Sequence, residues 1–172
     1  GDRRGEFLRA AVAVRTAVAD ADLQRYLHLR SELRSVVSPA WLLHVYRGLA
    51  EDDVREVVLR ELVGTDGGFD TFLEVENEQD PSPYLFSRVA RQCRGVRPAS
   101  AGEWRKGWYC DKQSGRNGIL VSIGVLDWMA EERCSVEGAC FLAPLAANGN
   151  LYRVEVREGW WAVVDVSNLW IS

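Results

Sequence analysis

Apolar side chains recur at helical spacing through the first part of the chain. From Glu6 to about Val37 they return every three or four residues, which predicts one long helix with a bend near residues 19–22. Ser38 and Pro39 then provide an N-cap and a first-turn proline, so a second, shorter helix should begin there. The apolar positions of these two helices are Phe7, Ala11, Val14, Val18, Leu23, Tyr26, Leu27, Leu33, Val37, Trp41, Leu42, Val45 and Tyr46.

A third helix and a first strand should follow. The carboxylates at residues 51–53 suit the positive N-terminus of a helix, and Gly64 suits its end. Alternating polarity from Phe69 to Val75 predicts a strand. The buried stripe of this third helix would consist of Val54, Val57, Val58, Leu59 and Leu62.

The middle of the chain is punctuated by proline and glycine. The run Asp80-Pro81-Ser82-Pro83 breaks the strand and starts a helix over Tyr84 to about Cys93. A loop over 94–102 and a short strand over 104–109 complete this region.

From Gly118 onward the pattern is that of a sheet. Asn148-Gly149 and Glu158-Gly159 are tight-turn dipeptides, so the last strands should form neighbouring antiparallel hairpins. Tyr152, Val154 and Val156 alternate with polar residues, so one sheet face is dry and the helices must cover it. We therefore predict a single α+β domain over residues 1–172, with N-terminal helices packed on a curved antiparallel C-terminal sheet. The predicted strands are Ile119–Met129, Cys134–Leu145, Leu151–Arg157 and Trp160–Ile171.

Composition excludes several classes of protein. Apolar residues make up 47% and charged residues 27% of 172 residues, which is typical of a globular domain. The longest apolar stretches, such as Ile119 to Leu126, are far shorter than the roughly 20 residues of a membrane span. The net charge is −4 and the basic residues are scattered, so no nucleic-acid partner is expected. The chain opens Gly-Asp-Arg-Arg, after a trimmed methionine or a removed leader, which leaves cytoplasmic and exported locations both open.

Cysteine and histidine usage predicts no metal and no cofactor. The chain has no Cys-x-x-Cys motif, and its two histidines, His28 and His44, are isolated. Cys134 and Cys140 on one strand would lie about 20 Å apart, too far for the roughly 5.5 Å Cα separation of a disulfide. A bridge between Cys93 and Cys110 and a fully reduced state are both open.

The C-terminal third carries a resemblance. The motifs are Val136-Glu137-Gly138, the run from Gly149 to Val154 (Gly-Asn-Leu-Tyr-Arg-Val), the run from Gly159 to Val163 (Gly-Trp-Trp-Ala-Val) and the closing Trp170-Ile171-Ser172. This pattern resembles a group of uncharacterised bacterial proteins over roughly the last fifty residues. The order of helices, strand, helix and antiparallel meander is also similar to the nuclear transport factor 2-like superfamily, in which a curved sheet forms a cone, and to cystatin-like folds. Such cones host isomerases, dehydratases and non-catalytic binding or dimerisation modules, so the resemblance implies a fold and leaves the function open.

Candidate acid-base residues are few. His44 lies beside Tyr46 on a predicted helix, and Asp127 and Asp165 lie on predicted strands among apolar residues. A carboxylate that projects into an apolar cone has a raised pKa and can abstract a proton. Strand alternation instead turns Asp127 and Asp165 toward water if Trp128 and Val164 face inward.

Aromatic residues indicate a binding surface. Seven tryptophans are many for this length, and neighbouring Trp160 and Trp161 should point to opposite faces of a strand. Trp128, Tyr152 and Trp161 are the candidate ligand-binding residues. The apolar segment 140–146 contains a proline that suits an edge or a bulge, where a second copy could pair.

Two functions follow from these patterns. The first is a non-catalytic module that binds a small apolar molecule or a protein partner, with a homodimer through the sheet as one form. The alternative is an isomerase or dehydratase with Asp127, Asp165 or His44 as base and Tyr46 or Tyr152 as hydrogen-bond donor.

Overall fold

The computed structural model describes residues 20–31, 38–64, 69–76, 78–143 and 145–172, apart from the side chain of Ala40. Within these ranges residues 20–31 are helical, which agrees with part of the long helix that the sequence predicts. The remainder of that predicted helix, including the start of its bend, lies outside the described residues.

Local sequence signals mark two of the starts and one of the ends of three further helices. The Ser38 hydroxyl accepts a hydrogen bond from the Trp41 amide at 3.2 Å, and the Ser82 hydroxyl accepts one from the Leu85 amide at 3.1 Å. Gly64 ends the second of these helices at a φ of 66°, a left-handed value that favours glycine. The predicted N-cap Ser38 and the predicted end at Gly64 are confirmed, and Ser82 is the N-cap of the helix predicted to start in the run 80–83. The helices are α2 (Pro39–Val45), α3 (Arg47–Val63) and α4 (Pro83–Gln92).

The predicted start of α3 is wrong. The helix begins at Arg47, so the carboxylates at residues 51–53 lie beyond its first turn and cannot act on its N-terminus. Arg47 Nε instead binds Glu51 Oε1 at 2.8 Å within the helix. Asp52 and Asp53 are buried in the interior of the protein.

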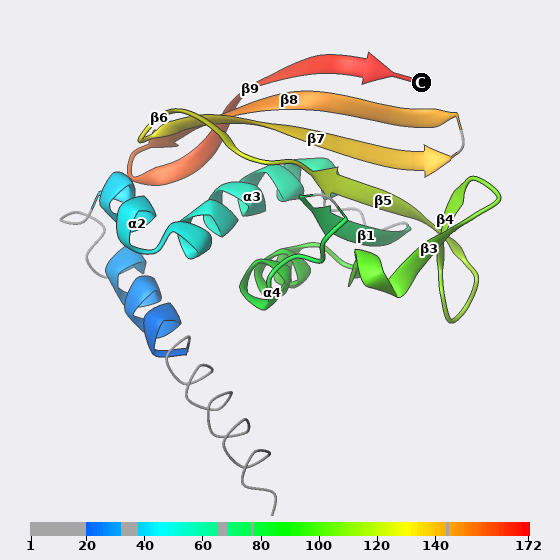
Figure 1. Ribbon diagram of the computed structural model, residues 1–172, viewed down its shortest axis with the longest axis horizontal. Helices are drawn as coiled ribbons and strands as arrows, with labels where there is room; N and C mark the ends of the chain where they lie inside the picture. The colour runs from blue at the N-terminus through cyan, green and yellow to red at the C-terminus, as the bar shows by residue number, and fades with distance from the viewer. Residues whose placement is uncertain (1–19, 32–37, 65–68, 77, 144) are drawn as a thin grey trace, which may run out of the picture.

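The strands form one curved, mostly antiparallel sheet (Figure 1). Its main path runs β2-β1-β5-β7-β8-β9, with β4 added beside β5, β3 beside β4, and β6 beside β7. The α+β class is confirmed. The strands are β1 (Asp70–Val75), β2 (Val96–Pro98), β3 (Gly102–Arg105), β4 (Trp108–Asp111), β5 (Asn117–Ile123), β6 (Asp127–Ala130), β7 (Arg133–Ala143), β8 (Ala146–Arg157) and β9 (Trp160–Ile171), and a short 3-10 helix covers Ala99–Ala101.

Part of the sheet is parallel, which the sequence pattern does not predict. β1 lies between β2 and β5 and runs parallel to both, and α4 connects β1 to β2. The loop predicted over 94–102 contains β2, and the strand predicted over 104–109 is the β3–β4 hairpin. The run predicted as one strand over 119–129 is divided into β5 and β6.

One of the two predicted tight turns is absent. Glu158 and Gly159 have φ values of 53° and 81° between β8 and β9, as the prediction required. Asn148 and Gly149 instead lie within β8. Gly149 is needed there because the Trp170 indole covers it, and a Cβ atom would lie 2.4 Å from that ring.

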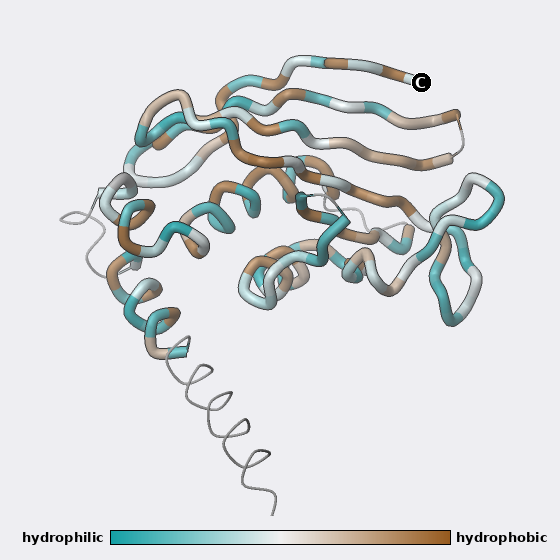
Figure 2. Tube along the Cα trace, viewed as in Figure 1, coloured by the Kyte–Doolittle hydropathy of each residue, from teal (hydrophilic) through white to brown (hydrophobic). Residues whose placement is uncertain are grey.

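The core lies between the helices and one face of the sheet. Val54, Val58 and Leu59 of α3 are fully buried against sheet residues such as Leu73 and Val121. A smaller cluster on the opposite face consists of Phe72, Ala99, Tyr109 and Leu120. Figure 2 shows hydrophobic residues concentrated in β1 and β5 and hydrophilic ones in the β3–β4 hairpin. None of the described helices is long and apolar enough to cross a membrane.

The open edges of the main path are β2 and β9. The segment predicted as an edge, residues 140–146, begins in the interior of the sheet, because Cys140 pairs with Val121 on one side and Asn148 on the other. The pairing of β7 with β8 shifts register between Phe141 and Ala143, so a bulge is present there. The long open edge belongs to β9.

Candidate ligand-binding cavity

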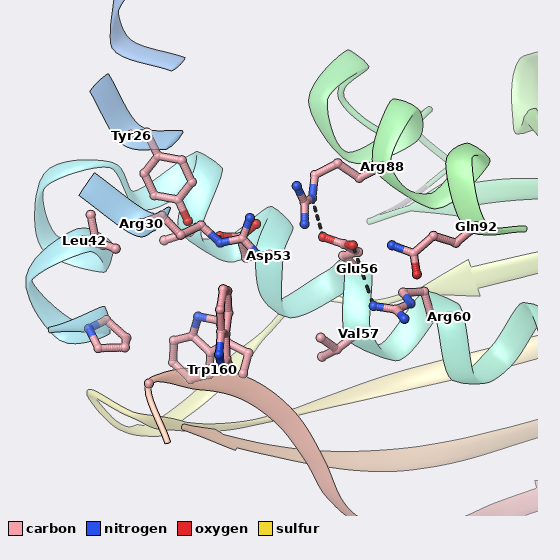
Figure 3. Close-up of a pocket in the computed structure, with 14 residues that line it drawn as sticks. Tyr26, Arg30, Leu42, Asp53, Glu56, Val57, Arg60, Arg88, Gln92 and Trp160 are labelled. Atoms are coloured by element: carbon pink, nitrogen blue, oxygen red, sulfur yellow. Dashed lines mark hydrogen bonds and ion pairs between the residues drawn. The ribbon is translucent and has the colours of Figure 1, made fainter. Parts of the chain in front are cut away.

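A cavity of about 350 Å3 lies where the helices meet the start of β9 (Figure 3). The helix over 20–31, α2, α3 and α4 form its helical walls, and the turn before β9 forms the remainder. A volume of this size suits a small organic molecule. The residues that line it include Tyr26, Arg30, Asp53, Glu56, Val57, Arg60, Arg88, Gln92, Trp160 and Trp161.

Helix α3 supplies the charged floor of the cavity. Asp53, Glu56, Val57 and Arg60 are spaced three, four and seven residues apart, so they share one face of the helix. Asp53 is 3% exposed and Glu56 2% exposed. Two buried carboxylates one turn apart require donors from neighbouring elements.

Asp53 receives those donors from three sides. The Tyr26 hydroxyl donates to Oδ2, the Tyr84 hydroxyl donates to Oδ1 at 2.8 Å, and Arg30 Nε lies 3.0 Å from Oδ2. Burial raises the pKa of Asp53, and the positive charge of Arg30 opposes that rise. Burial and the Asp53 charge together raise the pKa of both tyrosines, which keeps their hydroxyls protonated as donors.

Glu56 is held by arginines. Arg88 Nε donates to Glu56 Oε2, and Arg60 Nη1 lies 4.0 Å from Oε1. The Arg88 guanidinium also lies over the ring of Tyr84, 5.6 Å from its centroid. Arg88 is therefore fixed by two partners, whereas Arg60 is only loosely held by Glu56.

Two tryptophans at the start of β9 form the aromatic wall. Trp160 is 42% exposed, and the Arg30 guanidinium lies 5.4 Å from its ring centroid. Trp161 is partly buried against the main core and meets Trp128 edge to face, with ring centroids 5.7 Å apart. The Glu158-Gly159 turn brings both indoles to the cavity although they are neighbours in the chain.

A second buried polar cluster lies elsewhere on α3. Arg55 Nη1 binds Asp52 Oδ1 at 3.1 Å and the same guanidinium binds Glu76, while the Ser82 hydroxyl donates to Asp52 Oδ2 at 2.5 Å. Burial raises the pKa of Asp52. These contacts tie the segment between β1 and α4 to α3, so we assign them a structural role.

The four predicted acid-base candidates are not brought together. Asp127 is exposed on β6, and Asp165 is exposed on β9, where its Oδ2 accepts a hydrogen bond from Arg153 at 2.5 Å. His44 is exposed in the last turn of α2, and Tyr46 packs partly buried against Tyr26. None of these four residues lines the cavity.

The three predicted ligand-binding aromatic residues differ in their position relative to the cavity. Trp161 lines the cavity, and Trp128 supports it from β6. Tyr152 is 4% exposed within the main core, where the Asn150 side chain lies 3.5 Å from its hydroxyl. Of the three predicted residues, Trp161 is the one that lines the cavity, and its neighbour Trp160, which also lines it, was not among them.

Sequence reasoning missed the polar residues of the cavity. The signal in α3 was weak, because two other buried charged residues, Asp52 and Arg55, share the middle of the helix with Asp53 and Glu56. Their partners Tyr26, Arg30 and Arg88 come from other helices, and only the fold brings them close.

The cysteines and the possible metal ligands complete the chemical inventory. All four cysteines are free, including Cys93 and Cys110. Over the part of the chain that the structure describes, no group of three or more histidine, cysteine or acidic side chains could hold a metal ion.

The chain matches no protein-family model, no curated protein sequence and no solved structure. The resemblance to the nuclear transport factor 2-like superfamily therefore stays a prediction.

Proposed function

We propose that this protein is a non-catalytic binding module that holds a small molecule with a flat apolar ring in the cavity between α3, α4 and the start of β9. The observation that carries the proposal is the aromatic wall of Trp160 and Trp161 on a cavity of about 350 Å3. Indole faces bind flat rings through dispersion and apolar burial, and partly exposed tryptophan is typical of binding surfaces.

The polar residues favour binding over catalysis. A general base needs a lone pair that is free to take a proton from the substrate. Both oxygens of Asp53 already accept hydrogen bonds or ion pairs from protein groups, and Glu56 is held by Arg88. Such carboxylates hold the walls of the cavity in place, which supports a binding function over a catalytic one.

The test is titration of the protein with 2-naphthylmethanol, an uncharged flat probe, by calorimetry. Trp160→Ala should weaken binding about tenfold or more, because an aromatic contact contributes on the order of 1 kcal/mol beyond its burial. Trp104→Ala is the matched control, since Trp104 is 54% exposed on β3 and outside the cavity lining. Equal affinities for the two variants would count against this cavity as the binding site.

An isomerase or dehydratase is the second candidate, and one observation favours it. The Asp53 carboxyl, whose pKa burial raises, lies beside the cavity with two tyrosine hydroxyls. An enzyme of this kind would slowly convert the compound it binds, and Asp53→Asn would bind the compound without converting it. Recovery of every bound compound unchanged from wild-type protein would exclude this candidate.

A second copy of the chain is the protein partner that the open edge of β9 favours. This edge is twelve residues long, and its exposed apolar side chains include Val164, Val166 and Leu169. Long apolar edges recruit further strands, and a homodimer could form by antiparallel pairing. Light scattering at about 100 μM protein tests this, well above a micromolar dissociation constant. A monomeric mass there would exclude the homodimer.

A further inference from the structure

We infer that the ligand of the cavity carries a single negative charge, a carboxylate attached to its flat ring, and that Arg60 binds this carboxylate. The inference rests on the proposed function and specifies the class of ligand. It follows from how the charges of the cavity are paired.

Arg30 cannot recognise an anion without giving up its own partner. Its Nε lies 3.0 Å from Asp53 Oδ2, and its guanidinium stacks on Trp160. Asp53 is 3% exposed, so removal of Arg30 from it would leave a buried carboxylate with less compensation. Arg30 therefore belongs to the cavity wall.

Arg88 is committed in the same way. Its Nε donates to Glu56 Oε2, and Glu56 is 2% exposed. The Tyr84 ring lies beneath the guanidinium. A ligand anion would have to compete with a buried carboxylate for this side chain, which is unfavourable.

Arg60 differs from both. Its guanidinium is 4.0 Å from Glu56 Oε1, at the limit of an ion pair, and its side chain is 47% exposed. The cavity lining holds three guanidinium groups and two carboxylates, so one positive charge is left uncompensated, and it resides on Arg60. Arg60 lines both this cavity and the neighbouring hollow, whereas Glu61, the next residue, lines the hollow and not this cavity.

The geometry suits a ring with an acid group at one end. Figure 3 shows Arg60 and Gln92 on one side of Val57 and Trp160 on the other in this view. A guanidinium binds a carboxylate through two parallel N–H donors, and the Gln92 amide offers a further donor. The ring would then lie over Val57 and against the indoles.

The experiment compares three probes that share one ring. Calorimetry measures the binding of 2-naphthoate, 2-naphthylmethanol and 2-naphthylmethylammonium to wild-type protein and to Arg60→Gln. Arg91→Gln is the matched control, because Arg91 is exposed on α4 next to Gln92 and outside the cavity lining. Circular dichroism confirms that each variant is folded.

We expect naphthoate to bind about tenfold more tightly than the alcohol, since a charge-assisted bidentate contact is among the stronger polar contacts. Arg60→Gln should lose about tenfold affinity for naphthoate and leave the alcohol unchanged, while Arg91→Gln changes neither. The naphthoate affinity should also fall as salt is added.

The contrary outcomes separate the two proposals. Equal binding of all three probes, weakened by Trp160→Ala and unaffected by Arg60→Gln, would overturn the charge inference and leave the binding module standing. Preference for the ammonium probe would overturn the inference in favour of a cationic ligand. Failure of all three probes to bind up to about 1 mM would overturn both, because the aromatic wall would then bind no flat ring with useful affinity.

Discussion

The buried hydrogen bond from Tyr26 to Asp53 makes a quantitative prediction. Tyr26 is 1% exposed and Asp53 3% exposed, so Tyr26→Phe removes a donor from a carboxylate that water does not reach. A hydrogen bond to a charged group contributes about 1.5–3 kcal/mol to stability. Asp53 keeps the Tyr84 hydroxyl at 2.8 Å and Arg30 at 3.0 Å, so the carboxylate is not left without partners. We therefore expect a loss of about 1.5–2 kcal/mol, the lower part of that range.

Guanidinium chloride unfolding at neutral pH, followed by far-UV circular dichroism, measures this loss. Tyr84→Phe is the matched comparison, since it removes a second donor from the same carboxylate. Repeating Tyr26→Phe in an Asp53→Asn background gives the coupling between the two groups, expected to exceed about 0.5 kcal/mol for a direct contact. Hydrogen exchange over residues 20–31 should accelerate in Tyr26→Phe, because Tyr26 fixes this helix to α3.

A change below about 0.5 kcal/mol, with no coupling to Asp53, would refute the reasoning, because substitutions at uninvolved surface sites fall within that limit. It would mean that the Tyr26 hydroxyl contributes nothing to the anchoring of residues 20–31 on Asp53.

Three other measurements test the interior. Gly138→Ala would place a methyl group 2.6 Å from Leu62 Cδ1 and 2.9 Å from Tyr152 Cε2, so we expect a loss of about 1–3 kcal/mol, and an unchanged denaturation midpoint would contradict this packing. Because burial raises the pKa of Asp53, its contribution to stability is full below the ordinary carboxyl pKa and is lost as pH rises through the folded value. The stability of wild type relative to Asp53→Asn should therefore fall as the pH rises above the ordinary carboxyl pKa of about 4, and a constant difference would show that this pKa is not raised. Burial raises the pKa of Cys134 to about 12, so iodoacetamide should modify this thiol at neutral pH only after denaturation, as peptide mass spectrometry can establish.

Elements with a local signal were predictable from the sequence. Ser38 and Ser82 each precede a proline and accept a backbone hydrogen bond as N-caps, and Glu158-Gly159 adopts the positive φ values of a tight turn. Strand β9 has the predicted bounds, Trp160–Ile171. In each case the signal lies within a few residues of the structure that it produces.

Features that depend on distant partners were not predictable. The parallel direction of β1 leaves no trace in its alternation, because side chains alternate in the same way in parallel and antiparallel strands. Gly149 follows Asn148 in a dipeptide that is typical of a tight turn, but its role is to make room for Trp170 on the next strand. The carboxylates of α3 fit a helix N-terminus as well as a buried cluster, and only the positions of Tyr26 and Arg88 decide between them.

The position of β1 has a consequence for how the chain folds. Glu74 on β1 accepts a hydrogen bond from Ser122 on β5, and these two residues are 48 positions apart. At a synthesis rate of about 5–20 residues per second, one edge of β1 stays unpaired for roughly 2–10 s before β5 has been synthesised. During that interval Phe72 and Leu73, which are fully buried in the finished sheet, have no β5 to cover them. Strand β1 is thus made early but is paired on both edges only after β5 has been synthesised, so the nascent chain passes through a stage that exposes part of its own core.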